Sequence, residues 1–253
     1  MRLLQAHPLL RGGVDLSGGP AIPERLARIR GRIDDACRHA GRPAGSVILI
    51  GASKTQPAPV LAEAFQAGLR IFGENRVQEG LAKSRELPPE IEWHLIGPLQ
   101  SNKVRAALDL FHTIHSIDRL SIAEAIEREA KRRGIAVTGF LEVNLGSEET
   151  KHGFPAEGLA ETVRPLADFK HLRIVGLMAI PPLGRAAEES RPWFRRLREL
   201  RDALAAHPEW AGFPGWLSMG MSDDFEVAIE EGATHVRVGT ALFGARQAPA
   251  LDR

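Results

Sequence analysis

The chain has 253 residues, 43% of them hydrophobic, and a formal net charge of +1. That length suits one large domain, and near-neutral charge argues against a nucleic-acid surface, which usually has a clustered basic excess. Cys37 is the single cysteine, so an internal disulfide is excluded and we expect a reducing compartment, the cytoplasm. No apolar run approaches the ~20 residues that a membrane span needs, so we expect no membrane contact.

Residues 1–20 are predicted to form a flexible N-terminal leader, because the pairs Gly12-Gly13 and Gly18-Gly19 lie there and polar residues interrupt its leucines. A single domain is then expected over 21–253. It opens with an extra helix, Ile22–Ala40, in which Leu26, Ile29 and Ile33 recur at helical spacing.

From there, short apolar strands alternate with helices along the chain. The first strand ends at Lys54, and the others are expected at Leu69–Phe72, Glu92–Ile96, Phe111–His115, Ala136–Asn144, Arg173–Met178, Gly215–Met219 and His235–Val238. Helices are expected at Ala58–Ala67, Asn75–Arg85, Ser101–Ala107, Arg119–Arg133, Ala156–Phe169, Ala186–Ala206 and Asp223–Gly232. Such alternation predicts a parallel sheet closed into a single (β/α)8 TIM barrel of the α/β class. An open doubly wound sheet is the alternative, although its glycine-rich fingerprint is missing after the first strand.

Lys54 ends the buried run Val47-Ile48-Leu49-Ile50, at the edge of the sheet where a barrel carries its chemistry. Burial disfavours the ammonium form of a lysine, and only the neutral amine attacks an aldehyde to form a Schiff base. The alternative is a lysine that merely reaches solvent as its strand ends.

Two loops near the C-terminus combine small residues with hydroxyls. Ser218 and Ser222 follow the seventh strand, and Gly239 and Thr240 follow the eighth. Exposed backbone N–H groups at such positions bind phosphate, and barrels often hold phosphate at these two loops. Ser222 and Thr240 are equally compatible with ordinary helix caps.

Further polar candidates lie on or after other strands. Arg237 alternates with valines on the eighth strand, so it is expected to point into the barrel, where its charge needs a partner. A cofactor's ring nitrogen or the carboxylate of Glu142 would serve. Asn75 follows the second strand, as a site residue or a helix cap. His112 and His115 face opposite sides of a strand, so we expect no metal site.

Together these residues resemble the pyridoxal phosphate homeostasis proteins, a family similar to the barrel domain of alanine racemase. The resemblance is carried in order by Ser53-Lys54-Thr55, Phe72-Gly73-Glu74-Asn75, residues 93–103, 176–181 and 217–224, and Val236-Arg237-Val238-Gly239-Thr240 with the residues up to 246. It implies pyridoxal 5′-phosphate held as an imine on Lys54. It further implies phosphate contacts from Ser218, Gly239 and Thr240, with Asn75 beside the ring and Arg237 facing its nitrogen.

Three functions compete: a cofactor carrier, an amino-acid racemase and a Schiff-base aldolase. Racemisation needs an acid–base group on each face of the substrate carbon. In the racemases that this family resembles, one of these groups is a tyrosine, and this chain contains none. An arginine at the ring nitrogen also opposes the protonation that makes the ring an effective electron sink. Neither point excludes residual racemase activity.

We therefore predict a monomeric, cytoplasmic, non-catalytic protein that binds pyridoxal phosphate and buffers or delivers it in vitamin B6 homeostasis. Transient contact with apo-enzymes that use this cofactor is compatible with that role. The racemase is the alternative function. Lys103 and Lys151 are left without an assigned role.

Overall fold

The computed structural model describes residues 21–146, 152–182 and 186–244. The predicted leader, 1–20, and Lys151 therefore lie outside the described residues. Within them, strands form one sheet in the order β4-β3-β2-β1-β9-β8-β7-β5-β6, and a further pairing of β4 with β5 closes it into a barrel. The strands are β1 (Ile48–Ala52), β2 (Ile71–Glu74), β3 (Glu92–Leu95), β4 (Thr113–Ile117), β5 (Val137–Asn144), β6 (Phe154–Pro155), β7 (Leu172–Met178), β8 (Trp216–Ser218) and β9 (His235–Val238).

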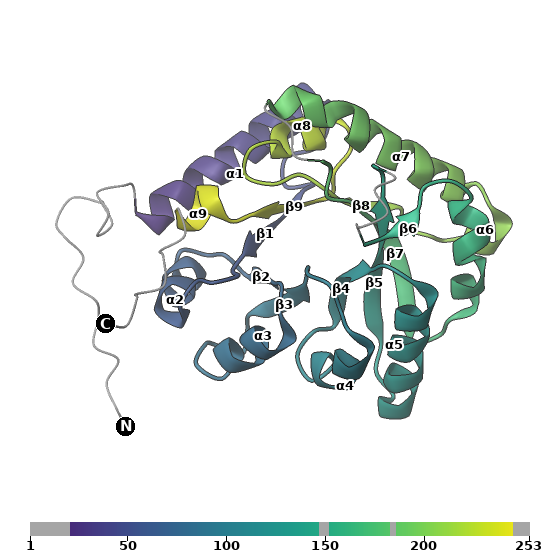
Figure 1. Ribbon diagram of the computed structural model, residues 1–253. Helices are drawn as coiled ribbons and strands as arrows, with labels where there is room; N and C mark the ends of the chain where they lie inside the picture. Colours follow the sequence, from purple (N-terminus) through teal and green to yellow (C-terminus); the bar gives the residue numbers. More distant parts are fainter. Residues whose placement is uncertain (1–20, 147–151, 183–185, 245–253) are drawn as a thin grey trace.

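Adjacent strands pair in parallel, and helices lie around the outside (Figure 1). This confirms the predicted parallel barrel. The helices are α1 (Ile22–His39), α2 (Ala58–Gln66), α3 (Val77–Ser84), α4 (Val104–Ala107), α5 (Leu120–Arg133), α6 (Leu159–Val163), α7 (Arg191–Ala205), α8 (Phe225–Glu230) and α9 (Thr240–Phe243). Short 3-10 segments are η1 (Ser101–Lys103), η2 (Arg164–Asp168), η3 (Ala187–Ser190) and η4 (Pro208–Trp210).

Two predicted helices are divided by proline, which lacks a backbone N–H and clashes with the preceding turn. The helix expected at 156–169 is instead the short α6 followed by η2, with Pro165 at the junction. The helix expected at 186–206 is η3 followed by α7, which carries Pro192 in its first turn. The two-residue strand β6, which pairs with β5, was not predicted.

The extra N-terminal helix is confirmed as α1. Leu26, Ile29 and Ile33 are buried on one face of it, and it ends before Gly41, which has a positive φ of 66°. This conformation costs glycine little, because glycine has no Cβ. α1 packs against α8 and α9, so it covers the side of the barrel where the last strand, β9, pairs with β1 (Figure 1).

Glycines reveal which way the strand residues face. A Cβ at Gly51 would meet Leu69 on the helical side, whereas a Cβ at Gly73 would meet Ile50 and Ile96 inside the barrel. Since strand side chains alternate, Ile48, Ile50 and Ala52 of β1 face inward. The inward positions of β9 are then those of His235 and Arg237, which contact side chains from other strands across the interior.

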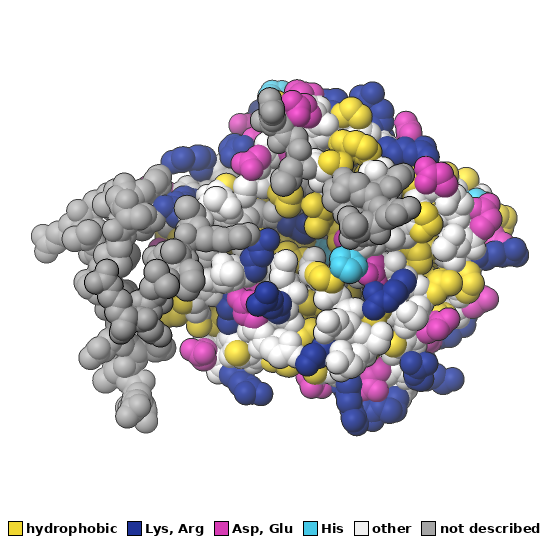
Figure 2. Space-filling model, viewed as in Figure 1, with side chains coloured by type: hydrophobic (Ala, Val, Ile, Leu, Met, Phe, Trp, Pro, Cys, Tyr) yellow, Lys and Arg dark blue, Asp and Glu magenta, His cyan; other side chains and the backbone are white. Residues whose placement is uncertain are grey.

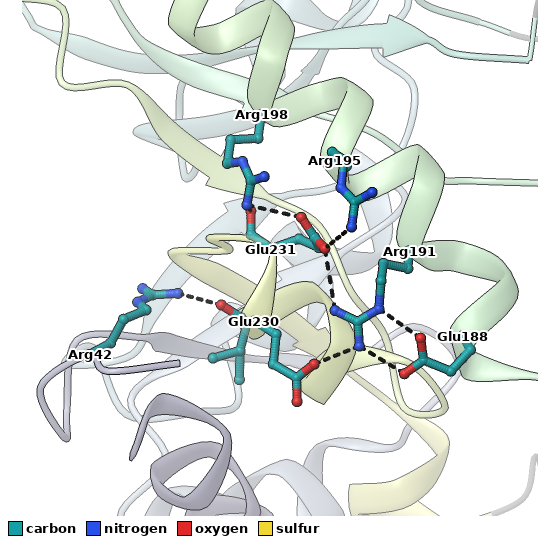
Figure 3. Close-up of polar contacts among 8 residues, drawn as sticks. Arg42, Glu188, Arg191, Arg195, Arg198, Glu230 and Glu231 are labelled. Atoms are coloured by element: carbon teal, nitrogen blue, oxygen red, sulfur yellow. Dashed lines mark hydrogen bonds and ion pairs between the residues drawn. The ribbon is translucent and has the colours of Figure 1, made fainter. Parts of the chain in front are cut away.

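An ion-pair network ties α8 to α7 (Figure 3). Glu231, just after α8, accepts from Arg191 at 3.3 Å and Arg195 at 3.1 Å, and lies 2.9 Å from Arg198. Burial raises the pKa of Glu231, but the hydrogen bonds from Arg195 and Arg191 outweigh it and leave the pKa lowered. Arg42, beyond α1, donates to the carbonyl of Ile229 at 2.9 Å. These contacts fix α8 and hence the loop, 219–224, that leads into it.

The surface carries both charge signs. On the described part of the face in Figure 2, Lys and Arg side chains are interspersed with Asp and Glu. Among the described helices, none combines the length and apolar character that would let it cross a membrane.

Candidate functional site

Lys54 follows the C-terminal end of β1 and is half-buried. β1 lies between β2 and β9 in the sheet, so the lysine emerges between the ends of those strands. The bond from Ser53 N–H to the Gly73 carbonyl, at 2.9 Å, continues the pairing with β2 up to the residue before the lysine. The predicted position of Lys54 at the barrel's C-terminal mouth is thus confirmed.

A buried clamp fixes the residues on either side of Lys54. The ammonium of Lys83, from α3, donates to the Ser53 carbonyl at 2.8 Å, Glu74 Oε1 at 2.7 Å and Glu79 Oε1 at 2.6 Å. The hydroxyl of Ser53 also donates to Glu74 Oε1, at 2.7 Å. Thr55 has a positive φ of 64°, which a β-branched residue rarely adopts, and its N–H donates to Glu79 Oε1 at 2.7 Å.

The pKa values of the two glutamates of this clamp are shifted in opposite directions. The side chain of Glu74 is fully buried, and this burial raises its pKa despite the bond from Lys83. Glu79 also loses hydration, but hydrogen bonds from Lys83 and the Thr55 N–H outweigh that loss and lower its pKa. Lys83 contacts both carboxyl groups at similar distances, and its contact with Glu74 offsets part of the cost of burying that group.

Asn75 lies at the end of β2, beside the lysine, and is half-buried. Gly97 packs against it: a Cβ at Gly97 would come within 2.5 Å of the Asn75 carbonyl oxygen. Only glycine permits this approach, so the loop after β3 holds Asn75 by its backbone. The structure thus brings Asn75 to the same end of the barrel as Lys54.

Arg237 points into the barrel as predicted and is buried, with 5% of its surface exposed. Its guanidinium donates to the Ser218 carbonyl and hydroxyl, both at 2.7 Å, and to the Ala179 carbonyl at 3.0 Å. Burial lowers its pKa to about 10, and attraction to Glu142 and Asp224 opposes that shift. The hydrogen bonds of Arg237 thus go to neutral oxygens, and Glu142 acts on it only through the electrostatic field.

Ser218 ends β8 and is fully buried. Its hydroxyl lies 2.7 Å from Arg237 Nη1 and 2.8 Å from His115 Nδ1. The predicted phosphate contact of Ser218 stays a prediction, and these two bonds already engage its hydroxyl within the barrel wall.

Ser222, in the loop that follows Ser218, contacts the backbone just after the end of β9. The hydroxyl of Ser222 accepts from the N–H of Gly239 at 3.3 Å and of Ala241 at 3.2 Å. Ser222 is half-buried, and Thr240 is exposed beside it. Gly220, with φ of 90°, turns the loop into place, since a Cβ there would lie 2.6 Å from Ala228 Cβ. A hydroxyl with adjacent N–H groups is a suitable cradle for a phosphate.

Sequence reasoning missed Lys83, His94 and His115 as parts of the site's support. All three are buried and bonded to residues far away in the sequence. The one signal in the sequence was the presence of a charged or polar residue on an otherwise apolar face. The sequence does not show which partner such a residue contacts.

These residues fit the cofactor that the resemblance implies. Pyridoxal phosphate needs an amine for its aldehyde, a partner for its ring nitrogen and donors for its phosphate. Lys54, Arg237 and the Ser222–Gly239 cradle supply these at the ends of β1, β8 and β9, which are adjacent in the sheet. Within the described ranges, no group of His, Cys, Asp or Glu side chains could hold a metal ion.

Comparison with known families matches residues 25–247 to the model of the alanine racemase N-terminal domain. A pyridoxal phosphate homeostasis protein from Aquifex aeolicus is 48% identical over 225 residues, which is 88% of this chain and 98% of that protein. Its namesake from Pseudomonas aeruginosa is 44% identical over 228 residues, covering 89% and 96%.

Solved structures give the same result. PipY of Synechococcus elongatus, with PLP bound, superposes with a TM-score of 0.78 at 40% identity. The match covers 88% of this chain and 100% of PipY. An alanine racemase from Clostridium difficile matches with a TM-score of 0.63 at 14% identity, over 94% of this chain but 58% of the racemase. That second likeness shows the fold alone, and the racemase extends beyond the matched region.

The clamp predicts a specific pattern of stabilities. Lys83→Met leaves the buried Glu74 without a cation, so we expect the free energy of unfolding to fall by about 3 kcal/mol. Glu74→Gln in the same chain removes the uncompensated carboxyl, so the double variant should be more stable than Lys83→Met alone. Chemical denaturation measures both, with Lys131→Met, at an exposed position on α5, as the control. Additive losses in the double variant would contradict the clamp.

Proposed function

The chain belongs to the pyridoxal phosphate homeostasis proteins, and from that membership we propose that it holds pyridoxal 5′-phosphate through Lys54 and buffers or delivers it in vitamin B6 homeostasis. The observation that carries this proposal is the meeting of Lys54, Arg237 and the Ser222–Gly239 cradle at the ends of adjacent strands. The binding of PLP by PipY, at 40% identity, supports it.

Each side chain has a distinct task in this proposal. The amine of Lys54 forms the carbon–nitrogen bond with the aldehyde, and the clamp at Ser53 and Thr55 fixes its backbone. Arg237 donates toward the ring nitrogen, and its contacts with the Ser218 and Ala179 oxygens hold the guanidinium in place. Gly239 and Thr240 receive the phosphate as predicted from the sequence, and we propose Ser222 in place of Ser218, whose hydroxyl is bonded to Arg237 and His115. Asn75 lies beside the ring. The cofactor would supply the aldehyde carbon that Lys54 binds, with release of one water, and a phosphate group that anchors it.

We propose that the protein is a carrier rather than a catalyst. A cationic donor at the ring nitrogen keeps that nitrogen unprotonated, which weakens the ring as an electron sink. The chain also contains no tyrosine to act as a second acid–base group. We further propose that it acts as a monomer in the cytoplasm and meets apo-enzymes transiently. The single cysteine, Cys37, is buried and suits a reducing compartment. The domain division at residue 20 stays a prediction.

The amine at residue 54 has a direct spectroscopic test. Adding pyridoxal phosphate to the wild-type chain should produce an imine absorption band, and Lys54→Ala should abolish that band while leaving the circular dichroism spectrum unchanged. Lys103→Ala is the matched control and should keep the band. An unchanged spectrum in Lys54→Ala would refute the assignment.

The two serines of the 218–222 loop should differ in what they recognise. Ser222→Ala should weaken binding of pyridoxal phosphate by roughly tenfold but leave pyridoxal, which has no phosphate, little affected. Ser218→Ala should change the affinity for both ligands alike, because Ser218 contacts Arg237 and not the cradle. Absorbance titrations give the four dissociation constants. A selective loss of phosphate recognition in Ser218→Ala would reverse the assignment.

Racemase activity separates the carrier from its alternative. We expect L-alanine to keep its configuration when incubated with the loaded chain, because no second acid–base tyrosine exists. Chiral chromatography measures D-alanine, and the Lys54→Ala chain sets the background. Formation of D-alanine that depends on Lys54 would favour the racemase.

A further inference from the structure

A row of hydrogen-bonded side chains crosses the barrel interior from Arg237 to the opposite rim. Arg237 Nη1 lies 2.7 Å from Ser218 Oγ, which lies 2.8 Å from His115 Nδ1. His115 Nε2 lies 3.0 Å from His94 Nδ1, and His94 Nε2 lies 2.8 Å from Glu92 Oε1. We call these five residues the relay.

One end of the relay is exposed to solvent and the other is buried in the barrel. Glu92 is the first residue of β3 and its side chain is 58% exposed, so it marks the N-terminal rim of the barrel. The four other members are buried, and they come from β3, β4, β8 and β9. The relay therefore connects solvent at the rim to the buried guanidinium of Arg237, on the strand beside the one that leads to Lys54.

The two ends of the relay fix the direction of every bond. A guanidinium only donates, and an ionised carboxylate only accepts. The bond with His94 lowers the pKa of Glu92, so Glu92 is ionised at neutral pH. His94 must then donate through Nε2–H, which in the neutral ring leaves Nδ1 to accept from His115.

The same logic continues inward. Burial, followed by the repulsion that a protonated His94 or His235 would exert and by the charge of Arg237, lowers the pKa of His115 well below its usual value, so this ring is neutral. Because His115 donates through Nε2–H, its Nδ1 accepts, and the proton of Ser218 Oγ points at it. Ser218 Oγ then offers a lone pair to Arg237. With both histidine rings neutral, one arrangement of protons satisfies all members.

His115 is held in this orientation by its neighbours. Its ring stacks on Phe140 with centroids 4.2 Å apart and planes 9° apart. His235 lies edge-on to both rings, at 5.8 Å from His115 and 5.0 Å from Phe140, but its own Nδ1 bonds to Thr234 Oγ1 at 2.8 Å. His235 thus occupies the same interior without belonging to the relay, which makes it a matched control.

We propose that His115 and His94, oriented by Glu92, are positioning residues that fix the Ser218 hydroxyl and so aim Arg237 at the ring nitrogen of bound pyridoxal phosphate. The relay itself stands on the described contacts, and only its effect on the cofactor rests on the proposed function. The protein thereby sets the protonation of a ring at the mouth from the far rim of the barrel.

The first experiment uses the cofactor-free chain with nitrogen-15 in its histidines. At about pH 8, above the ordinary imidazole range, two-dimensional NMR should show His94 and His115 with the proton on Nε2. Glu92→Gln should mix the tautomers of both rings, since an amide both donates and accepts. Glu90→Gln, at an exposed neighbouring position, should not. A proton on Nδ1 of either ring in the wild-type chain would overturn the relay.

The second experiment measures pyridoxal phosphate binding and its imine spectrum. His115→Phe breaks both bonds of that ring and should weaken binding by about fivefold or more and shift the imine band. His115→Asn should restore the wild-type band, because an amide oxygen can still accept from Ser218. His235→Phe should change affinity by less than about twofold, since it leaves each relay bond in place.

The outcomes separate the two claims. An imine band in the wild-type chain that is unchanged in His115→Phe, or an equal shift in His235→Phe, would overturn the positioning role alone. Absence of any band in the wild-type chain would contradict the proposed function, while the tautomer measurement would still decide the relay. If His115→Phe fails to fold, Glu92→Gln decides the positioning role, because a shifted imine band that is absent in Glu90→Gln supports it and an unchanged band refutes it.

Discussion

The contacts of the Lys83 ammonium fix the backbone on either side of Lys54. The ammonium lies between the carboxylates of Glu74 and Glu79 and the carbonyl of Ser53, and so ties β1, β2 and α3 together at one point. Removing one partner of a buried ion pair typically costs 3–5 kcal/mol, or roughly a third of a domain's stability. Lys54, the lysine that we propose binds the cofactor, lies between the two residues that this clamp holds, Ser53 and Thr55. Thr55 keeps its left-handed conformation, which costs about 1 kcal/mol or more, because Glu79 holds its N–H.

A second constraint is the burial of one positive charge that has no direct carboxylate partner among the residues that the structure describes. Arg237 is satisfied by carbonyl and hydroxyl oxygens from β8 and the end of β7, and burial lowers its pKa to about 10. A buried guanidinium with donors to spare suits an acceptor such as a ring nitrogen. In the proposed complex, the guanidinium that holds the ring nitrogen would also make the ring a poorer electron sink.

Sequence patterns predicted what depends on local periodicity. The alternation of strands and helices, the extra helix α1 and the inward direction of Arg237 all follow from spacing, and the structure confirms them. Proline breaks at 165 and 192 were visible in the sequence, but their effect on helix length depends on packing. The contacts of Lys83 with Ser53 and of His94 with His115 were not predictable, because they join residues 30 and 21 positions apart in the sequence. His112 and His115 do face opposite ways: His112 is exposed and His115 buried.

The central claim is that one lysine, out of all those in the chain, takes the cofactor covalently. Reduction with borohydride after addition of substoichiometric pyridoxal phosphate makes the bond permanent, and mass spectrometry of a protease digest then locates the added mass. We expect that mass on the peptide containing Lys54. A label spread over the exposed lysines, or placed on Lys103, would contradict the account.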